Sequence, residues 1–164
     1  VRTVAPGQFE NFGSTLRRGV EASASWTPLD TLRFRAVYGV TQTRVTSNAD
    51  ASLLDKRVPT VPVNSSTFEA NYAPRDRLGF DAAYRFVGGY FIDALNTTRA
   101  SSFGLLDLGL SWRGAGTTPY RAYFRIENVS DRRYATSELF FAGNQRAVAP
   151  GAPRSFRLGA QVNL

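Results

Sequence analysis

The sequence predicts an all-β fold, an antiparallel up-and-down meander of about seven strands of the kind that forms transmembrane β-barrels. The first observation is that apolar side chains recur at every second position in seven segments, and a period of two is typical of a strand with two different faces. The second is that short turns and longer polar loops alternate between these segments. The third is that large aromatic residues stand beside the short turns.

Three strands are expected in the first half of the chain. Their apolar residues lie two positions apart: Val20, Ala22, Ala24 and Trp26 in Ser14–Thr27; Leu32, Phe34, Ala36, Tyr38 and Val40 in Thr31–Val45; Phe68, Ala70 and Tyr72 in Val63–Ala73. Pro28 and Pro74 mark the turns after the first and third strands, because proline fixes its own φ and lacks the N–H that a ladder needs. The polar segment 46–62 is expected to form a longer loop.

Four more strands are expected in the second half. Their apolar residues follow the same spacing: Leu78, Phe80, Ala82, Tyr84, Phe86 and Tyr90 in Leu78–Ile92; Leu106, Leu108, Leu110 and Trp112 in Phe103–Arg113; Tyr120, Ala122, Phe124 and Ile126 in Tyr120–Asn128; Phe156, Leu158, Ala160, Val162 and Leu164 in Phe156–Leu164. Segment 114–119 is expected to be a short turn, whereas 93–102 and 129–155 are expected to be long loops.

The loop pattern and the aromatic residues indicate which face meets lipid. In a meander, alternating connections place all short turns at one end and all long loops at the other, as in bacterial outer-membrane barrels. Four aromatic residues stand near short turns on the apolar face: Trp26, Tyr72, Trp112 and Tyr120. Trp and Tyr prefer the membrane–water interface, so we expect these four to mark one membrane boundary. A soluble sandwich would instead bury the apolar face.

The opposite face of the predicted sheet is charged. Its acidic and basic residues are Glu21, Arg33, Arg35, Glu69, Asp81, Arg85, Asp107, Arg113, Arg121, Arg125 and Glu127. In a barrel they would face the lumen, where acids and arginines pair across neighbouring strands. No pair has a spacing that singles out a catalytic dyad, so structural pairing is the expectation for each residue.

Composition argues against most enzyme chemistry. The 164 residues include no Cys and no His, which removes thiolate metal ligands and the commonest general base. We therefore expect no catalytic, metal or cofactor site. No run of about 18 apolar residues and no charged-then-apolar leader is present, which excludes a transmembrane helix and a retained signal peptide. The 164 residues are one domain's worth of sequence, in which we expect no internal boundary. Because the first residue is Val1 and the sequence has no Met, we expect a chain that is processed or, in preference, a piece of a longer one.

Four local segments, in order along the chain, resemble those of TonB-dependent outer-membrane receptors. Glu127-Asn128-Val129-Ser130-Asp131-Arg132-Arg133-Tyr134 resembles their E-N-L-F-D-x-x-Y segment, and Pro150-Gly151-Ala152-Pro153-Arg154-Ser155-Phe156 their P-G-x-P-R-x-F segment. Arg18-Gly19-Val20-Glu21 is similar to x-G-V/I-E, and Lys56-Arg57-Val58-Pro59-Thr60-Val61-Pro62 to G-K-R-x-P-N-x-P. Ser130 and Thr60 depart from the usual Phe and Asn.

The last eight residues also resemble the outer-membrane assembly signal, a polar residue, a glycine and two final apolar positions. The matching residues are Arg157, Gly159, Val162 and Leu164. Leu164 stands where the family has an aromatic residue, which bears on assembly efficiency.

The resemblance implies the C-terminal part of a 22-stranded barrel in the outer membrane of a Gram-negative bacterium. Such receptors hold a plug domain, absent from this sequence, and import a scarce ligand such as a ferric siderophore with energy passed through TonB. The implied partners are outer-membrane lipid and lipopolysaccharide, the receptor's own plug, TonB, the barrel assembly machinery and the ligand. The loop arginines Arg44, Arg57, Arg99 and Arg146 are candidates to attract an anionic chelate, although they could equally bind lipopolysaccharide phosphate or hold neighbouring loops.

Two alternatives stay open at this point. One is another outer-membrane barrel, porin-like or small, for which the spare segment 1–13 with its Pro6-Gly7 break is a poor eighth strand. The other is a soluble basic β domain that binds single-stranded nucleic acid, which the net charge of +7 permits. Because arginines and aromatics lie on opposite faces of the strands, we expect no nucleic-acid partner.

Overall fold

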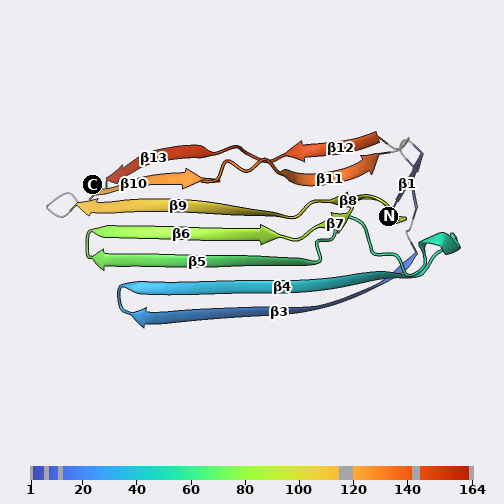
Figure 1. Cartoon of the computed structure of the whole chain (residues 1–164), viewed down its shortest axis with the longest axis horizontal. Helices are drawn as coiled ribbons and strands as arrows, with labels where there is room; N and C mark the ends of the chain where they lie inside the picture. The colour runs from blue at the N-terminus through green and yellow to red at the C-terminus, as the bar shows by residue number, and fades with distance from the viewer. Residues whose placement is uncertain (1, 6–7, 11–12, 115–119, 142–144, 163–164) are drawn as a thin grey trace.

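The computed structural model describes residues 2–5, 8–10, 13–114, 120–141 and 145–162. Its main element is a seven-stranded antiparallel sheet in the order β13-β10-β9-β6-β5-β4-β3 (Figure 1). The strands are β3 (Ser14–Leu29), β4 (Leu32–Ser47), β5 (Asn64–Arg75), β6 (Leu78–Val87), β9 (Phe103–Gly114), β10 (Tyr120–Glu127) and β13 (Ser155–Val162). Every strand pairs with its neighbour in the meander, so the predicted all-β up-and-down fold is confirmed.

The strand register keeps the two faces separate across the whole sheet. Phe34 is paired with Ala70, and Ala70 with Ala82, so apolar residues face one side in successive strands. One step along, Arg35 is paired with Glu69. A slip of one residue would turn the apolar side chains of a strand to the polar face. The register observed between the strands therefore keeps the apolar residues of all strands on one face.

The long connections lie at one end of the sheet and carry small elements of their own (Figure 1). They are the 3-10 helix η1 (Ala51–Leu53), the paired strands β7 (Tyr90–Phe91) and β8 (Arg99–Ala100), and the hairpin β11 (Ala135–Phe141) with β12 (Gln145–Pro150). The N-terminal strands β1 (Arg2–Ala5) and β2 (Gln8–Glu10) pair with each other. The prediction that 93–102 and 129–155 are plain loops was therefore wrong.

Four predicted strand ends were also wrong. Pro28 and Pro74 were expected in turns after Thr27 and Ala73, but β3 continues to Leu29 and β5 to Arg75. The ladder is irregular at both prolines, between Trp26 and Leu29 and between Tyr72 and Arg75, because proline has no N–H to donate.

The strand expected over Leu78–Ile92 ends at Val87. Gly88 follows and donates its N–H to the carbonyl of Asn64, the first residue of β5, at 2.8 Å, an approach so close that a Cβ at position 88 would collide with Asn64. The chain then continues as β7, outside the main sheet. The strand expected to reach Asn128 ends at Glu127, because Asn128 has a φ of +51° and leaves the extended conformation.

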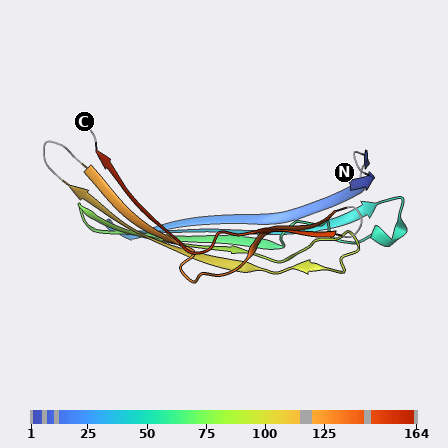
Figure 2. The same cartoon turned by 90° about the horizontal axis from the view of Figure 1, so that it is seen from above.

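The main sheet is a single bent layer, which Figure 2 shows from above. Its largest apolar side chains are exposed, with Val20 72%, Trp26 64% and Leu158 83% accessible. The buried apolar cluster lies in the connections instead, where Phe140 packs against Tyr90, Ile92 and Ala100. A protein that folds in water buries such side chains, so the apolar face needs an apolar partner. Within the described residues, no helix has the length and apolarity to cross a membrane.

Candidate functional site: the polar face and the loop end

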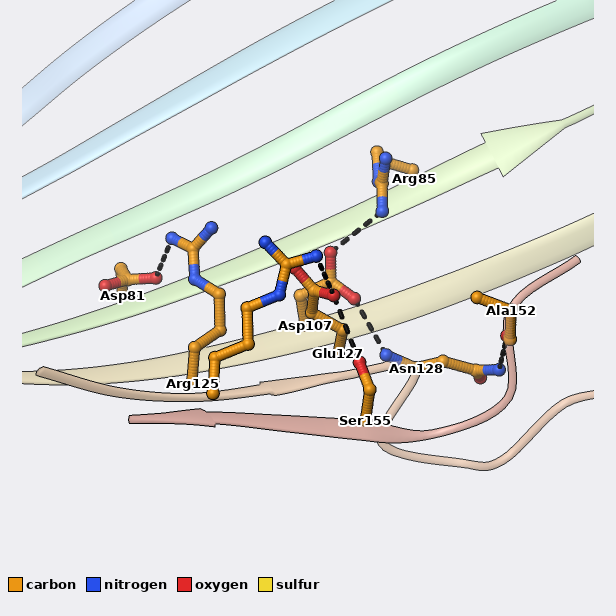
Figure 3. Close-up of polar contacts among 9 residues, drawn as sticks. Asp81, Arg85, Asp107, Arg125, Glu127, Asn128, Ala152 and Ser155 are labelled. Carbon is orange, nitrogen blue, oxygen red and sulfur yellow. Dashed lines mark hydrogen bonds and ion pairs between the residues drawn. The ribbon is translucent and has the colours of Figure 1, made fainter. Parts of the chain in front are cut away.

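Ion pairs cross the polar face of the sheet from strand to strand (Figure 3). Arg85 contacts Asp107 at 2.9 Å, Arg125 contacts Asp81 at 3.0 Å, Arg157 contacts Glu127 at 3.0 Å and Arg35 lies 3.7 Å from Glu69. The arginine side chains are about half exposed, so solvent screens them and each pair stabilises the fold by at most about 1 kcal/mol. The ion pairs hold the face in register and leave it hydrophilic.

The remaining predicted residues of this face are Glu21, Arg33, Arg113 and Arg121. The strand register places them on the same side of the sheet as the paired residues. Among the described residues, none of their side chains forms an ion pair. The charged face is therefore neutralised in part of its area only.

Asn128 joins the end of β10 to the segment that precedes β13. Its backbone N–H donates to Asp107 Oδ1 at 2.9 Å, and its side-chain amide donates to the carbonyls of Arg132 at 3.0 Å and Ala152 at 3.1 Å. Its Oδ1 accepts from the Arg132 N–H at 2.9 Å. The residue is only 4% exposed, so these bonds satisfy polar groups that water cannot reach.

Further contacts lock together the two motifs that carry the family resemblance. The Arg154 N–H donates to Asp131 Oδ1 at 2.9 Å, and the Gly151 N–H donates to the Tyr134 carbonyl at 2.8 Å. A side chain at Gly151 would overlap the Tyr134 ring, which packs on Phe103 with ring centroids 4.6 Å apart. Residues of the two motifs, Asn128, Asp131, Tyr134, Gly151 and Arg154, are therefore bonded into one unit at the loop end of β10 and β13, which we call the bracket.

Sequence reasoning identified this bracket only as a resemblance. Asn128 and Asp131 have φ values of +51° and +49°, and Asn and Asp are the non-glycine residues that best tolerate that conformation. Their spacing of three was the available signal for a tight turn after a strand. Asn128 bonds to Ala152, 24 residues away, and Asp131 bonds to Arg154, 23 residues away. No local sequence pattern predicts these distant contacts.

The three described positions of the assembly-signal match, Arg157, Gly159 and Val162, have distinct environments. Arg157 forms the ion pair with Glu127. Gly159 lies opposite Tyr123 on β10, whose ring occupies the space that a Cβ would need. Val162 ends β13 on the apolar face, where it is 54% exposed and paired with Tyr120. Leu164 lies outside the described residues.

The four candidate interface aromatics lie on the apolar face near the short turns. Trp26 is 64% exposed and stacks on Phe34 of the neighbouring strand, with centroids 5.6 Å apart. Tyr72 stacks on Phe80 at 6.3 Å. Trp112 and Tyr120 are 46% and 45% exposed. Their role at a membrane boundary stays a prediction.

The four candidate arginines lie at the opposite end of the sheet. The expectation that they are loop residues was right for Arg57 only, because Arg44 lies in β4, Arg99 in β8 and Arg146 in β12. Arg44 and Arg57 line one hollow, and Arg57 and Arg99 border a gap too narrow to hold water. Arg44 lies 3.4 Å from Asp55, and Arg99 lies over the Phe91 ring at 5.8 Å. Arg146 is separate, because it forms an ion pair with the buried carboxylate of Glu138 on the hairpin β11–β12.

The connections that carry these arginines are bonded to one another. Asn96 accepts from the Arg57 N–H at 2.7 Å and donates to the Arg57 carbonyl at 2.9 Å. The Glu138 N–H donates to the Tyr90 hydroxyl at 2.9 Å. Partial burial by itself raises the pKa of Asp93, but hydrogen bonds from Thr97 and Thr98 together outweigh it and hold the pKa below its usual value of 3.8. The loop end is thus held together by specific bonds.

Among the described residues, no group of three or more Cys, His, Asp or Glu side chains lies close enough together to hold a metal ion. The arrangement consists of an exposed apolar face, an opposite face with crossing ion pairs, and a bonded set of loops at one end. Together these features define a segment of the wall of a membrane β-barrel.

Comparison with known proteins identifies which barrel. Residues 1–129 match the family model described as TonB dependent receptor-like, beta-barrel. The chain therefore belongs to the TonB-dependent receptors, and its fold is a part of their β-barrel. These are receptors and not enzymes, and the membership decides against the porin-like barrel and the soluble nucleic-acid-binding domain.

Individual relatives agree with this assignment. The chain is 25% identical over 135 residues to the ferrioxamine B receptor of Salmonella typhimurium, an alignment that covers 79% of this chain and 19% of that receptor. Among solved structures, BauA, the ferric preacinetobactin receptor from Acinetobacter baumannii, superimposes with a TM-score of 0.76 at 20% identity, over 90% of this chain and 22% of BauA. The ferric yersiniabactin receptor FyuA from Yersinia pestis gives 0.74 at 22% identity, over 93% and 24%. The chain thus spans about a fifth of its relatives.

Proposed function

We propose that these residues form the C-terminal part of the barrel wall of an outer-membrane receptor that imports a ferric siderophore or a similar scarce ligand, with energy supplied through TonB. The observation that carries the proposal is the division of one sheet into an exposed apolar face and an ion-paired polar face, in a chain of this family. In the whole receptor the apolar face contacts lipid and the polar face lines the lumen. The relatives are named as receptors for ferrioxamine B and for ferric preacinetobactin, and PiuA from Acinetobacter baumannii is named as a siderophore receptor, which supports the ligand class.

The loop end is the proposed side of ligand arrival. Arg44 and Arg57 line a hollow at this end, and Arg99 lies close to Arg57. Arginines at the mouth of a channel raise the local concentration of an anionic ligand. Arg146 is the weakest of the four candidates, because its guanidinium neutralises Glu138. The plug, TonB, lipopolysaccharide and the barrel assembly machinery are the further partners of this proposal.

Uptake of radioactive iron by the full-length receptor tests the proposal. The receptor is expressed in a Gram-negative host that lacks its own siderophore receptors, and the cells are given iron complexed with ferrioxamine B or with other siderophores. We expect uptake of at least one ferric siderophore, and loss of that uptake when TonB is deleted. Uptake that persists without TonB, or no uptake from any siderophore by a receptor found in the outer membrane, would contradict the proposal.

A further inference from the structure

The apolar face of the sheet becomes basic at its loop end. Val20 of β3 lies opposite Val40 of β4 on this face. Toward the loop end, Arg18 lies two residues beyond Val20, and Arg44 lies four residues beyond Val40. Because side chains two residues apart point to the same side of a strand, both arginines continue the apolar face and not the face with the crossing ion pairs.

Three arginines border one open hollow of about 400 Å³ at this place, a set that we call the basic rim. Arg18 belongs to β3, Arg44 to β4 and Arg57 to the connection after η1, and all three are exposed. Among the described residues, no acid contacts the guanidinium of Arg18 or of Arg57. Arg44 lies 3.4 Å from Asp55, whose side chain is 79% exposed. Three positive charges therefore face one carboxylate, and the hollow keeps an excess of positive charge.

The length of the strands places the basic rim at the edge of the apolar band. Phe34 pairs with Trp26, the aromatic residue expected at the opposite membrane boundary. A tilted barrel strand rises about 2.5 Å per residue along the membrane normal, so β4 climbs about 25 Å from Phe34 to Arg44. The apolar band of outer-membrane barrels has about this height. The Arg44 guanidinium is therefore expected where the lipid headgroups begin, and the long side chain of Arg18 can reach the same level.

A phosphate group suits this place, because a guanidinium binds phosphate through two parallel hydrogen bonds. We propose that the basic rim binds the phosphate groups of a lipid headgroup in the outer leaflet, and that Asp55 competes with phosphate for Arg44. This inference rests on the proposed function, which places the apolar face in lipid. It assigns to a lipid two arginines, Arg44 and Arg57, that could otherwise attract a soluble chelate.

The test is lipid binding to the purified full-length receptor, stripped of bound lipid in detergent and followed by native mass spectrometry. The probe is lipid A, a glycolipid with two phosphate groups. Arg18→Gln and Arg44→Gln should each weaken the tightest binding step about fivefold, the effect of one arginine near an anionic lipid surface, and the double variant should weaken it further. Asp55→Asn should strengthen binding, because it frees Arg44 for phosphate.

Arg17→Gln is the matched control. Arg17 is the chain neighbour of Arg18, but it lies opposite Thr43 on the polar face. Its replacement removes the same charge from the same strand and should leave the binding of lipid A unchanged. Every variant should show the heat-modifiable band of the folded receptor.

Two further ligands separate the possible sources of phosphate. Lipid A without its phosphate groups should bind more weakly than lipid A, and inorganic phosphate at the same concentration should not displace lipid A. Displacement by inorganic phosphate would overturn the inference, because the basic rim would then be a site for free anions.

The variants can also contradict the inference. Equal weakening by Arg17→Gln and Arg18→Gln, or unchanged binding in a folded receptor with both Arg18 and Arg44 replaced, would show that the basic rim holds no lipid. Lipid binding that depends on Arg18 and Arg44, in a receptor without siderophore uptake, would retain the lipid site and reject the proposed function. Uptake without such binding would do the reverse.

Discussion

Asn128 is the residue on which the bracket between the last two strands depends most. Replacing it with Ala removes three side-chain hydrogen bonds in a buried place. It also puts at a φ of +51° a residue that tolerates this conformation less well than Asn does. We expect Asn128→Ala to lower the free energy of unfolding by about 2–4 kcal/mol. Urea titration of the receptor refolded in lipid vesicles measures this change.

The control is Asn128→Gly, which accepts the positive φ. It should destabilise less than Ala, and the difference between the two variants reports the strain of the positive φ in the folded state together with the greater flexibility of glycine in the unfolded chain. An Ala variant as stable as the wild type would show that the bracket does not hold the strand pair.

Asp93 makes the loop end sensitive to acid. Its pKa is lowered in the folded state, so its stabilising contribution is complete above the usual value of 3.8 and is lost as the pH falls through the folded value. We expect the amide resonances of Thr97 and Thr98 to shift together below pH 3.8. Asp93→Asn should abolish the shift, and a midpoint above 3.8 in the wild type would contradict the assignment.

At the scale of elements, β10 and β13 fit together through Tyr123 and Gly159. A methyl group at position 159 would overlap the Tyr123 ring, and overpacking of this kind costs about 1–3 kcal/mol. We therefore expect Gly159→Ala to slow assembly of the barrel, measured as the fraction of heat-modifiable receptor in a pulse-chase experiment.

Removing the ring provides the control. Tyr123→Ala should make assembly insensitive to Gly159→Ala, so that the double variant assembles no worse than Tyr123→Ala alone. Equal effects of Gly159→Ala with and without the ring would place the role of the glycine elsewhere.

The sequence contained enough to predict the strands of the main sheet, because alternation over about ten residues is a local and redundant signal. It also placed all eleven charged residues on one face, since the register follows from that alternation. The ion pairs themselves required the structure. Asp107 could meet an arginine on either neighbouring strand, and it pairs with Arg85 across β6 and β9.

The connections were the part that the sequence did not reveal. Strand β7 has two residues and depends on Tyr90, Ile92 and Ala100 packing against Phe140, which is distant in the chain. The hairpin β11–β12 is a partial exception, because the sequence between its two strands contains a Gly-Asn pair, which is typical of hairpin connections.

At the scale of the whole molecule, the exposed apolar face determines where the protein folds. Leu108 and Phe124 lie on that face, with 39% and 37% exposure. Leu108→Arg or Phe124→Arg should destabilise the barrel by about 2–4 kcal/mol, because an arginine at mid-membrane depth loses its hydration. The fraction of receptor recovered in the outer membrane should fall.

Arg125→Ala is the matched control, because it changes the opposite face and removes only the half-exposed ion pair with Asp81. The recovered fraction should be unchanged. If both arginine variants inserted normally, the apolar face would not be in lipid.

The central claim is that the apolar face of the sheet contacts lipid and the polar face does not. The most direct test measures the environment of consecutive residues of β9 in the membrane. Since the 164 residues contain no Cys, single cysteines at positions 106 to 110 of the full-length receptor can carry nitroxide labels, whose collision rate with oxygen reports contact with hydrocarbon. The account predicts high oxygen collision at Leu106, Leu108 and Leu110 and low collision at Asp107 and Gly109. High collision at Asp107 and Gly109 with low collision at the three leucines, or no alternation at all, would contradict it.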